Sequence, residues 1–188
     1  LNLLERDKNH NLMKYAYHIA IGDLLAIFHS RMEEISHPYL ISNKSLEINK
    51  IFSTFPNSKN FVGISWRSLS EMYHSERSYV LEDLCKSLNK NEDILVVLQP
   101  LATEEEILKL RSLGFTVIEN FDCLNDIDSV FSLISNCNKV ISIANSVVHF
   151  AGALGINTTL LLPKIPSWRW GLNKHRSDLY PSIKYKTP

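Results

Sequence analysis

The sequence has little of several features that would assign a function at once. Lysine and arginine together number 20, as do aspartate and glutamate, so the formal net charge at pH 7 is zero. A chain without a basic excess is not expected to bind nucleic acid or membrane surfaces through bulk charge. No apolar run reaches the length of a membrane-spanning helix, and the charged start of the chain lacks a signal-peptide layout. A cytoplasmic location is therefore expected.

Cysteine is also scarce, and the sequence contains no recognisable metal-binding or phosphate-binding signature. The three cysteines, Cys85, Cys123 and Cys137, are scattered and form no metal-like pair. We interpret them as reduced, small apolar residues of the interior. The histidines show no metal-ligand spacing, and no glycine-rich fingerprint is present. The sequence therefore predicts no metal site, and any phosphate site must be argued from other residues.

Apolar runs and helical periodicity alternate from residue 60 onward. Strands are predicted at 61–66, 93–99, 115–119, 139–143 and 156–163, and helices at 78–90, 103–114, 126–137 and 146–154. This alternation predicts an α/β fold, a Rossmann-like parallel sheet with helices on both faces. Residues 1–50 differ in pattern and are predicted to form a helical or extended N-terminal segment and connector. Residues 51–188 would then form the Rossmann-like domain with a C-terminal tail.

In folds of this class, ligands bind beyond the carboxyl ends of the strands, where the strand order reverses. Candidate site residues should therefore follow the predicted strands directly. They are Trp66-Arg67, Gln99-Pro100, Glu119-Asn120, Ala144-Asn145-Ser146 and Pro163-Lys164.

The stretch SIANSVVHFAGALG, residues 142–155, concentrates polar residues where a strand passes into a helix. Asn145 suits the N-cap of a helix that begins at Ser146, and Gly155 suits its C-terminal stop. The first amides of such a helix favour an anion, and Ser146 would add a donor. His149 lies one turn into the helix, where a diphosphate would favour its charged form. The alternative is a well-capped helix that carries a half-buried histidine and binds nothing.

Other polar residues allow a binding role or a purely structural one. Arg67 and Arg77 flank a polar loop, where they would either clamp phosphate oxygens or form surface ion pairs. Trp168 would either stack on a nucleobase or sugar ring or hold the tail against the domain. The acidic run 104–106 is interpreted as a solvated helix start, with Thr103 as its cap and Glu106 at the third helical position.

A family resemblance adds to this interpretation. The stretch VISIANSVVHFAGALGINTTLLLPKIPSWRWG, followed by DLYPSIKYK, resembles the end of the domain of glycosyltransferase family nine, the heptosyltransferase-like group. FVGISWRS at 61–68, VVLQ at 96–99 and HPYL at 37–40 are similar to the first strand, second strand and connector of that domain. The resemblance is nearest to the branch often found behind tetratricopeptide repeats.

The resemblance implies a GT-B architecture, in which two Rossmann-like halves face a cleft. This chain would hold the C-terminal half, which binds a nucleoside-diphosphate sugar as donor substrate, in a bacterial, cytoplasmic glycosyltransferase. The expected partners are that donor, an unidentified glycan or protein acceptor, and an N-terminal half or repeat domain outside these residues. The resemblance implies no metal or other cofactor. The implied donor-binding residues are Trp66, Arg67, Ser68, Arg77, Gln99, Asn145, Ser146, Val147, His149 and Trp168.

One departure from the family pattern leaves the choice of sugar and of function open. Ala144 stands where heptosyltransferases carry an acidic residue, so the resemblance does not specify heptose over hexose. No catalytic residue is assigned, and transfer would be metal-independent. A non-catalytic interaction module derived from GT-B proteins is the alternative. A nucleotide-sugar epimerase half shares the architecture, but it would require cleft carboxylates that the sequence does not place.

Overall fold

The computed structural model describes residues 36–43, 45–69, 78–170 and 175–187, which belong to one compact unit that begins at Ser36. Residues 36–43, the expected connector, contain no helix or strand. The backbone amides of Tyr39 and Leu40 both donate to the carbonyl oxygen of Ala153, at 3.1 Å each. The connector is therefore hydrogen-bonded to the helix that ends at Ala153. The predicted division at residue 50 stays a prediction, since residues 1–35 lie outside the described part.

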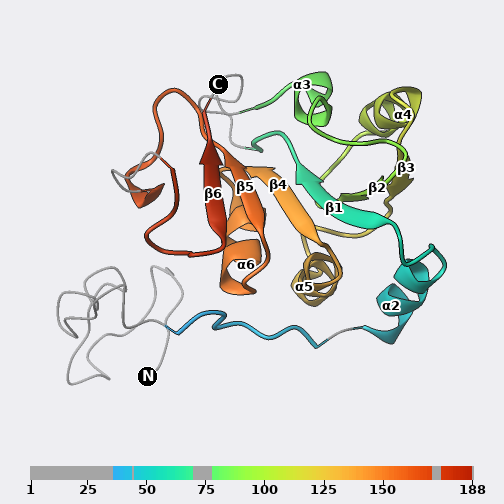
Figure 1. Ribbon diagram of the computed structural model, residues 1–188, viewed down its shortest axis with the longest axis horizontal. Helices are drawn as coiled ribbons and strands as arrows, with labels where there is room; N and C mark the ends of the chain where they lie inside the picture. Colours follow the sequence, from blue (N-terminus) through green and yellow to red (C-terminus); the bar gives the residue numbers. More distant parts are fainter. Residues whose placement is uncertain (1–35, 44, 70–77, 171–174, 188) are drawn as a thin grey trace, which may run out of the picture. The chain divides into compact units, whose positions relative to one another are not determined.

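The domain is built on a sheet of six parallel strands in the order β3-β2-β1-β4-β5-β6 (Figure 1). The strands are β1 (Asn60–Ser65), β2 (Asp93–Val97), β3 (Thr116–Ile118), β4 (Lys139–Ile143), β5 (Thr158–Leu161) and β6 (Ile183–Lys186). The order runs outward in opposite directions from the pair β1 and β4, so the topology reverses between these strands. This arrangement confirms the predicted Rossmann-like sheet.

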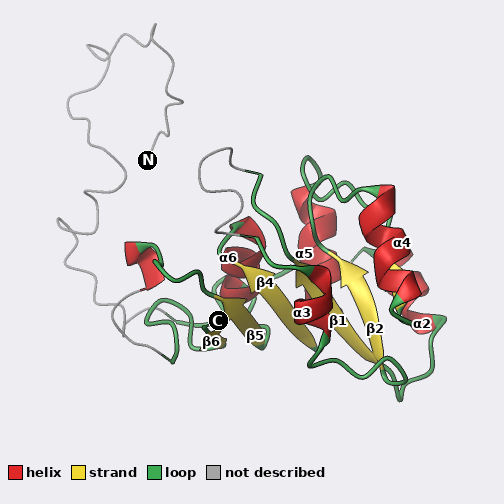
Figure 2. Cartoon of the chain, turned by 90° about the horizontal axis from the view of Figure 1, so that it is seen from above, coloured by secondary structure: helices red, strands yellow, loops and turns green. Residues whose placement is uncertain are grey.

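Helices cover both faces of this sheet, as predicted. They are α2 (Leu46–Ser53), α3 (Leu81–Cys85), α4 (Glu104–Ser112), α5 (Ile127–Ser135) and α6 (Ser146–Ala153), with a short 3₁₀ helix η4 (Trp168–Trp170). Figure 1 shows α3 and α4 along the upper side of the sheet and α2, α5 and α6 along the lower side. Figure 2, from above, shows α3 in front of the sheet. Neither α2 nor η4 was predicted.

Two main apolar layers, one on each face of the sheet, make up most of the core, and a third cluster joins α6 to β5 and the C-terminal segment. Ile94 and Val96 of β2 pack with α2, α5 and α6, whereas Leu95 and Val97 pack with α3 and α4. Each of these four side chains is at most 5% exposed. Because successive residues of a strand point to opposite faces, a strand buried on both sides must be apolar throughout. The uninterrupted apolar run at 94–98 follows from this requirement.

Helix α4 shows how local sequence fixes an element boundary. The Thr103 hydroxyl accepts from the Glu106 amide at 3.2 Å, and the Glu106 carboxylate accepts from the Thr103 amide at 2.8 Å. This reciprocal capping box satisfies two amides that the helix itself leaves unpaired. Gly114 ends the helix with φ of 92°, a conformation that glycine adopts without strain. The predicted cap and stop are both confirmed.

The C-terminal tail contains a strand, β6, that the sequence analysis did not predict. Ile183 is fully buried, while Lys184 and Lys186 are exposed, so the segment alternates with a period of two. It is an outer strand of the sheet, where it pairs with β5 on one side and forms an isolated antiparallel bridge from Lys184 to Arg176 on the other. Exposed lysines on an edge strand oppose pairing with another chain. The segment is short and half charged, so it does not form the apolar run by which the other strands were predicted.

The three cysteines are free, and burial gives them the inert character expected of interior residues. Cys85 and Cys137 lie in the two main apolar layers. Burial raises the pKa of Cys85 and of Cys123 to about 11, and that of Cys137 to about 12. Thiols with such values are poor nucleophiles at neutral pH.

Within the residues that the structure describes, no helix is long and apolar enough to cross a membrane.

Candidate functional site

The reversal point between β1 and β4 brings together most of the predicted site residues. After β1 the chain turns to the face that carries α3, and after β4 it turns to the face that carries α6. The two connections therefore diverge beyond the strand ends, which is the place where α/β proteins bind their ligands. Trp66 and Arg67 leave β1 at this edge, and Asn145 and Ser146 leave β4.

Asn145 joins the two diverging connections. Its side-chain oxygen accepts from the Val147 amide at 3.1 Å, which confirms the predicted N-cap of α6. The same oxygen lies 3.1 Å from the Ser142 hydroxyl, and the side-chain nitrogen donates to the Ser65 hydroxyl at 2.7 Å. One amide thus caps α6 and ties its start to the end of β1.

Gln99 continues this polar network to β2. Its side-chain oxygen accepts from the backbone amides of Trp66 and Arg67, both at 3.0 Å, and from the Ser65 hydroxyl at 3.1 Å. Gln99 is 2% exposed and Ser65 is fully buried. Buried polar groups of this kind are costly unless their hydrogen bonds are made. The network therefore fixes the backbone of the loop that follows β1.

Arg67 is held by a partner that the sequence analysis did not connect with it. Its Nε lies 2.7 Å from Oε1 of Glu106 and its Nη2 lies 3.3 Å from Oε2, while Nη2 also donates to the Leu101 carbonyl. The Trp66 indole donates to the same carboxylate at 2.8 Å. Burial opposes ionisation of Glu106, but the bonds from Arg67, Thr103 and Trp66 outweigh it and lower its pKa. Glu106 is therefore not part of a solvated acidic run.

The start of α6 presents an exposed hydroxyl at the same edge. Ser146, the first helical residue, is exposed, while Val147 behind it is 3% exposed. The positive end of the helix dipole is therefore accessible beside the Asn145 network. Gly155 follows the helix with φ of 72°, as the sequence predicted. Anion binding at this helix start stays a prediction.

His149 lies one turn into α6 and turns toward the C-terminal segment. Its ring stacks on Trp170 at a centroid distance of 4.9 Å, and its Nδ1 lies 3.1 Å from the Tyr180 hydroxyl. Burial lowers the pKa of His149, and the positive charge of Arg169 lowers it further. The half-buried neutral form is therefore favoured in the ligand-free protein, and the charged form expected beside a bound diphosphate stays a prediction.

Three predicted residues remain: Ser68, Arg77 and Trp168. Ser68 lies near the carboxyl ends of the strands, whereas Arg77 and the Trp168 side chain lie outside the part of the chain that the structure describes. The Ser68 amide donates to the Ser78 hydroxyl at 3.3 Å, close to the loop after β1. Arg77 lies outside the described residues. Trp168 belongs to η4, and only its backbone is described. Within the described residues, no three histidine, cysteine, aspartate or glutamate side chains gather as metal ligands.

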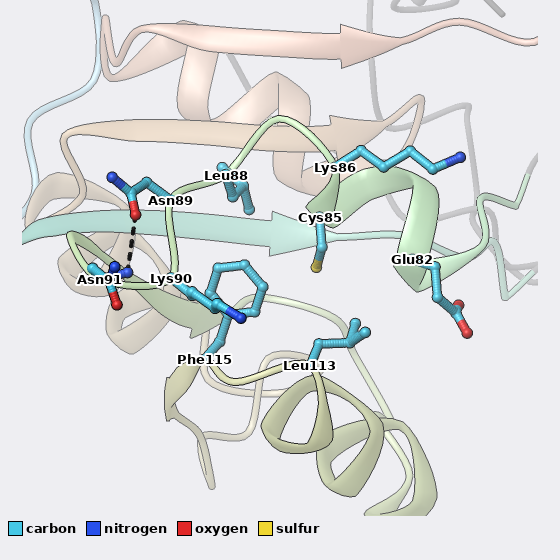
Figure 3. A pocket seen from close by; sticks show the side chains of 9 residues that line it. All are labelled: Glu82, Cys85, Lys86, Leu88, Asn89, Lys90, Asn91, Leu113 and Phe115. Atoms are coloured by element: carbon cyan, nitrogen blue, oxygen red, sulfur yellow. Dashed lines mark hydrogen bonds between the residues drawn. The ribbon is translucent and has the colours of Figure 1, made fainter.

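A hollow of about 460 Å³ lies at the opposite, amino edge of the sheet. Figure 3 shows Leu88 and Asn89 on one side of it and Leu113 and Phe115 on the other. These segments lead into the amino ends of β2 and β3, far from the strand ends that carry the Asn145 network. The Cys85 thiol that faces this hollow has its pKa raised to about 11, first by burial and then by the charge of Glu82. The hollow is therefore not part of the candidate site.

The comparisons with known proteins bear on the fold. The sequence matches no family model and no curated protein. Among solved structures, a glycosyl transferase family 9 protein from Veillonella parvula DSM 2008 matches with a TM-score of 0.59 and 13% identity, covering 100% of this chain and 51% of that one. In its fold, this chain is similar to the heptosyltransferase-like group of GT-B proteins.

A second structure agrees with the first. The E. coli ADP-heptose lipopolysaccharide heptosyltransferase II matches with a TM-score of 0.56 and 12% identity, covering 82% of this chain and 47% of that one. The chain therefore spans about half the length of each of these GT-B-like structures. At such identities the likeness extends to the fold alone, and the role of each residue must come from the site itself.

Several residues of the site were not singled out from the sequence. Ser65 and Ser142 are fully buried polar residues at the ends of apolar strands, and that contrast is a signal that could have found them. Trp170 and Tyr180 belong to tail residues that the sequence offered as contributors, but no local pattern indicated their contact with His149, because they approach α6 from a distant part of the chain. Their role becomes visible only when β6 takes its place in the sheet.

Proposed function

We propose that this chain is the nucleotide-sugar-binding half of a metal-independent glycosyltransferase that acts on a bacterial surface glycan or protein. The observation that supports the proposal is the arrangement at the reversal point. There the exposed start of α6, with Ser146 at its first position, lies beside the Asn145 network and the loop that carries Arg67. A helix start and an arginine at one strand edge suit a diphosphate.

The chemistry follows from charge that develops during transfer. When the bond from the sugar to the diphosphate breaks, negative charge accumulates on the departing phosphate oxygens. The α6 amides and Ser146 would donate hydrogen bonds to those oxygens, and Arg67 would offset their charge. His149 would add a positive charge if a bound diphosphate raised its pKa. No general base is assigned to a residue of this chain. The sugar, a hexose or a heptose, stays open.

Isothermal titration of the chain with UDP, GDP, ADP and CMP tests this proposal. We expect saturable binding of one nucleotide, weakened in Ser146→Ala and in His149→Ala. Ser112→Ala is the matched control, because Ser112 is an exposed serine that bonds its own helix end on α4. Unchanged affinity in both site variants, in folded protein, would refute the assignment of the site.

An interaction module without catalysis is the second candidate function, and specific contacts favour it. Arg67 already pairs with Glu106, and His149 already contacts Tyr180 and Trp170. The groups expected to bind a donor therefore have partners within the chain. This function predicts that the folded chain binds none of the four nucleotides, so the same titration separates the two candidates.

A further inference from the structure

Glu106 makes more contacts than a helix-capping residue requires. Within α4 it completes the capping box with Thr103. Across the strand edge, its two carboxylate oxygens also accept from Nε and Nη2 of Arg67 and from the Trp66 indole. A glutamine or an isolated glutamate would suffice for the cap. The additional contacts concern the loop after β1, which belongs to the candidate site.

The pairing of Arg67 with Glu106 is side-on, with two nitrogens of the guanidinium facing two oxygens of the carboxylate. The side chains of Arg67 and Glu106 are 19% and 20% exposed, so the pair is partly shielded from water. A two-point, partly buried pair restricts orientation far more than an exposed single contact does. The Leu101 carbonyl, which also accepts from Nη2, adds a third point of attachment. The guanidinium is thus fixed in direction as well as in place.

One edge of the guanidinium is left over by this arrangement. Nε and Nη2 are engaged, whereas Nη1 has no hydrogen-bond partner among the described residues. An arginine held at one edge can offer the other edge to a ligand without losing its position. The pair as a whole carries no net charge, so any selectivity would come from directed N–H groups rather than from bulk charge.

We propose that Glu106 is a positioning residue for the candidate site, which holds the Arg67 guanidinium so that its other edge can bind a phosphate group. The inference rests on the proposed function, because it assigns Glu106 its role through the phosphate-binding role of Arg67. Glu106 does not itself contact the ligand. Its own charge would repel an anion, so its presence beside Arg67 is useful only if orientation outweighs that repulsion.

Because repulsion by Glu106 and orientation of Arg67 act in opposite directions on affinity, a substitution of Glu106 can distinguish them. In Glu106→Gln the repulsion is removed and the cap is retained, since glutamine also completes a capping box. If charge alone mattered, the variant would bind a nucleoside diphosphate more tightly. Positioning predicts the opposite, a loss of about tenfold in affinity, the size expected when one charge-assisted hydrogen bond is lost.

Two matched variants separate positioning from a general effect on α4. Glu105→Gln removes the same charge from the neighbouring, exposed position. Thr103→Ala removes the threonine side of the capping box and leaves the Arg67 contacts intact. We expect both to stay within about twofold of the unmodified chain in affinity, as is typical of changes that leave the binding groups in place.

The closing experiment combines titration with nitrogen-detected magnetic resonance of the full chain. The Arg67 Nε–H signal, assigned by its loss in Arg67→Lys, should shift in Glu106→Gln and stay in place in Glu105→Gln and Thr103→Ala. Titration with the nucleoside diphosphate that binds best should show the tenfold loss in Glu106→Gln, and no further loss when that change is added to Arg67→Lys. An unshifted signal, tighter binding, or an equal loss in both backgrounds would overturn the inference.

The same experiment distinguishes failure of the proposed function from failure of the positioning role of Glu106. If the unmodified chain binds none of the nucleotides, the proposed function fails, and with it the ligand-binding part of this inference. The Arg67 signal in ligand-free protein still decides whether Glu106 holds the guanidinium. If the chain binds a nucleotide and Glu106→Gln has no effect, only the positioning role of Glu106 fails.

Discussion

At the scale of single residues, Asn145 carries an unusual share of the site. Its side chain contacts the start of α6, the end of β4 and the end of β1. A neutral amide can accept and donate at once, which a carboxylate cannot do. Because it adds no negative charge, it also leaves the helix start favourable for an anion. The residue therefore links the stability of the fold to the chemistry proposed for the site.

Asn145→Ala should lower the free energy of unfolding by about 2 kcal/mol, the combined effect of a lost N-cap and a lost bond to a buried hydroxyl. Urea denaturation followed by circular dichroism measures the change. Asn91→Ala, at an exposed loop position, is the control and should shift stability by less than about 0.5 kcal/mol. Equal effects of the two substitutions would contradict the structural role assigned to Asn145.

His149 makes stability depend on pH. Burial lowers its pKa from the ordinary value of 6.5, with Arg169 acting in the same direction. The unfolded chain therefore binds this proton more readily, so the contribution is fully present above pH 6.5 and is lost as pH falls through the folded pKa. The difference in stability between the unmodified chain and His149→Gln should shrink from pH 8 to pH 5. Denaturant titrations at both values measure it, and an unchanged difference would exclude the effect.

At the scale of elements, helix α6 packs closely against the C-terminal segment, and this packing sets the surroundings of His149. A Cβ added to Gly152 would lie 2.5 Å from Cγ of the Tyr180 ring and 2.9 Å from Ile183. Tyr180 cannot move away freely, because its hydroxyl also contacts Tyr39 and His149. A glycine in mid-helix normally weakens the helix, but here it permits the close approach of β6.

Gly152→Ala should therefore destabilise the protein by about 1 to 2 kcal/mol, although alanine is the better helix former. Thermal unfolding of the variant measures the loss. In a Tyr180→Ala background the ring is gone, and the same substitution should cost clearly less. If Gly152→Ala raises the melting temperature, the close packing of α6 on β6 is not as described.

At the scale of the whole molecule, the described unit has a Rossmann-like fold similar to that of GT-B proteins, and the chain spans about half the length of the two solved structures that it resembles. A cleft between two halves would leave the reversal point of this unit facing its partner. Under the proposed function, this unit is expected to bind the nucleotide.

Binding of a nucleotide to the folded state should raise the melting temperature of the chain. At a concentration 100 times the dissociation constant, the stabilisation is about 2.7 kcal/mol, which corresponds to a shift of about 5 to 10 °C for a chain of this size. A thermal shift series with UDP, GDP, ADP and CMP measures it, with the matching nucleosides as controls. Equal shifts from a nucleotide and its nucleoside would argue against a diphosphate site.

Local sequence alone determined much of this protein. Apolar runs and caps predicted five of the six strands, the capping box at Thr103 and Glu106, and the N-cap at Asn145. These features depend on residues within a few positions of one another, so periodicity and hydrogen-bonding capacity suffice to reveal them. The strand edge where the site lies followed from the alternation of strands and helices.

Tertiary structure alone decided which side chains meet. The pairing of Arg67 with Glu106 and the stacking of His149 on Trp170 join residues that are distant in sequence. The strand β6 is short and half charged; it pairs with the edge of β5, and Gly152 leaves room for Tyr180 and Ile183 beside α6. Such contacts depend on how the elements pack, and no local pattern encodes that packing. They set the charge and orientation of the groups at the candidate site.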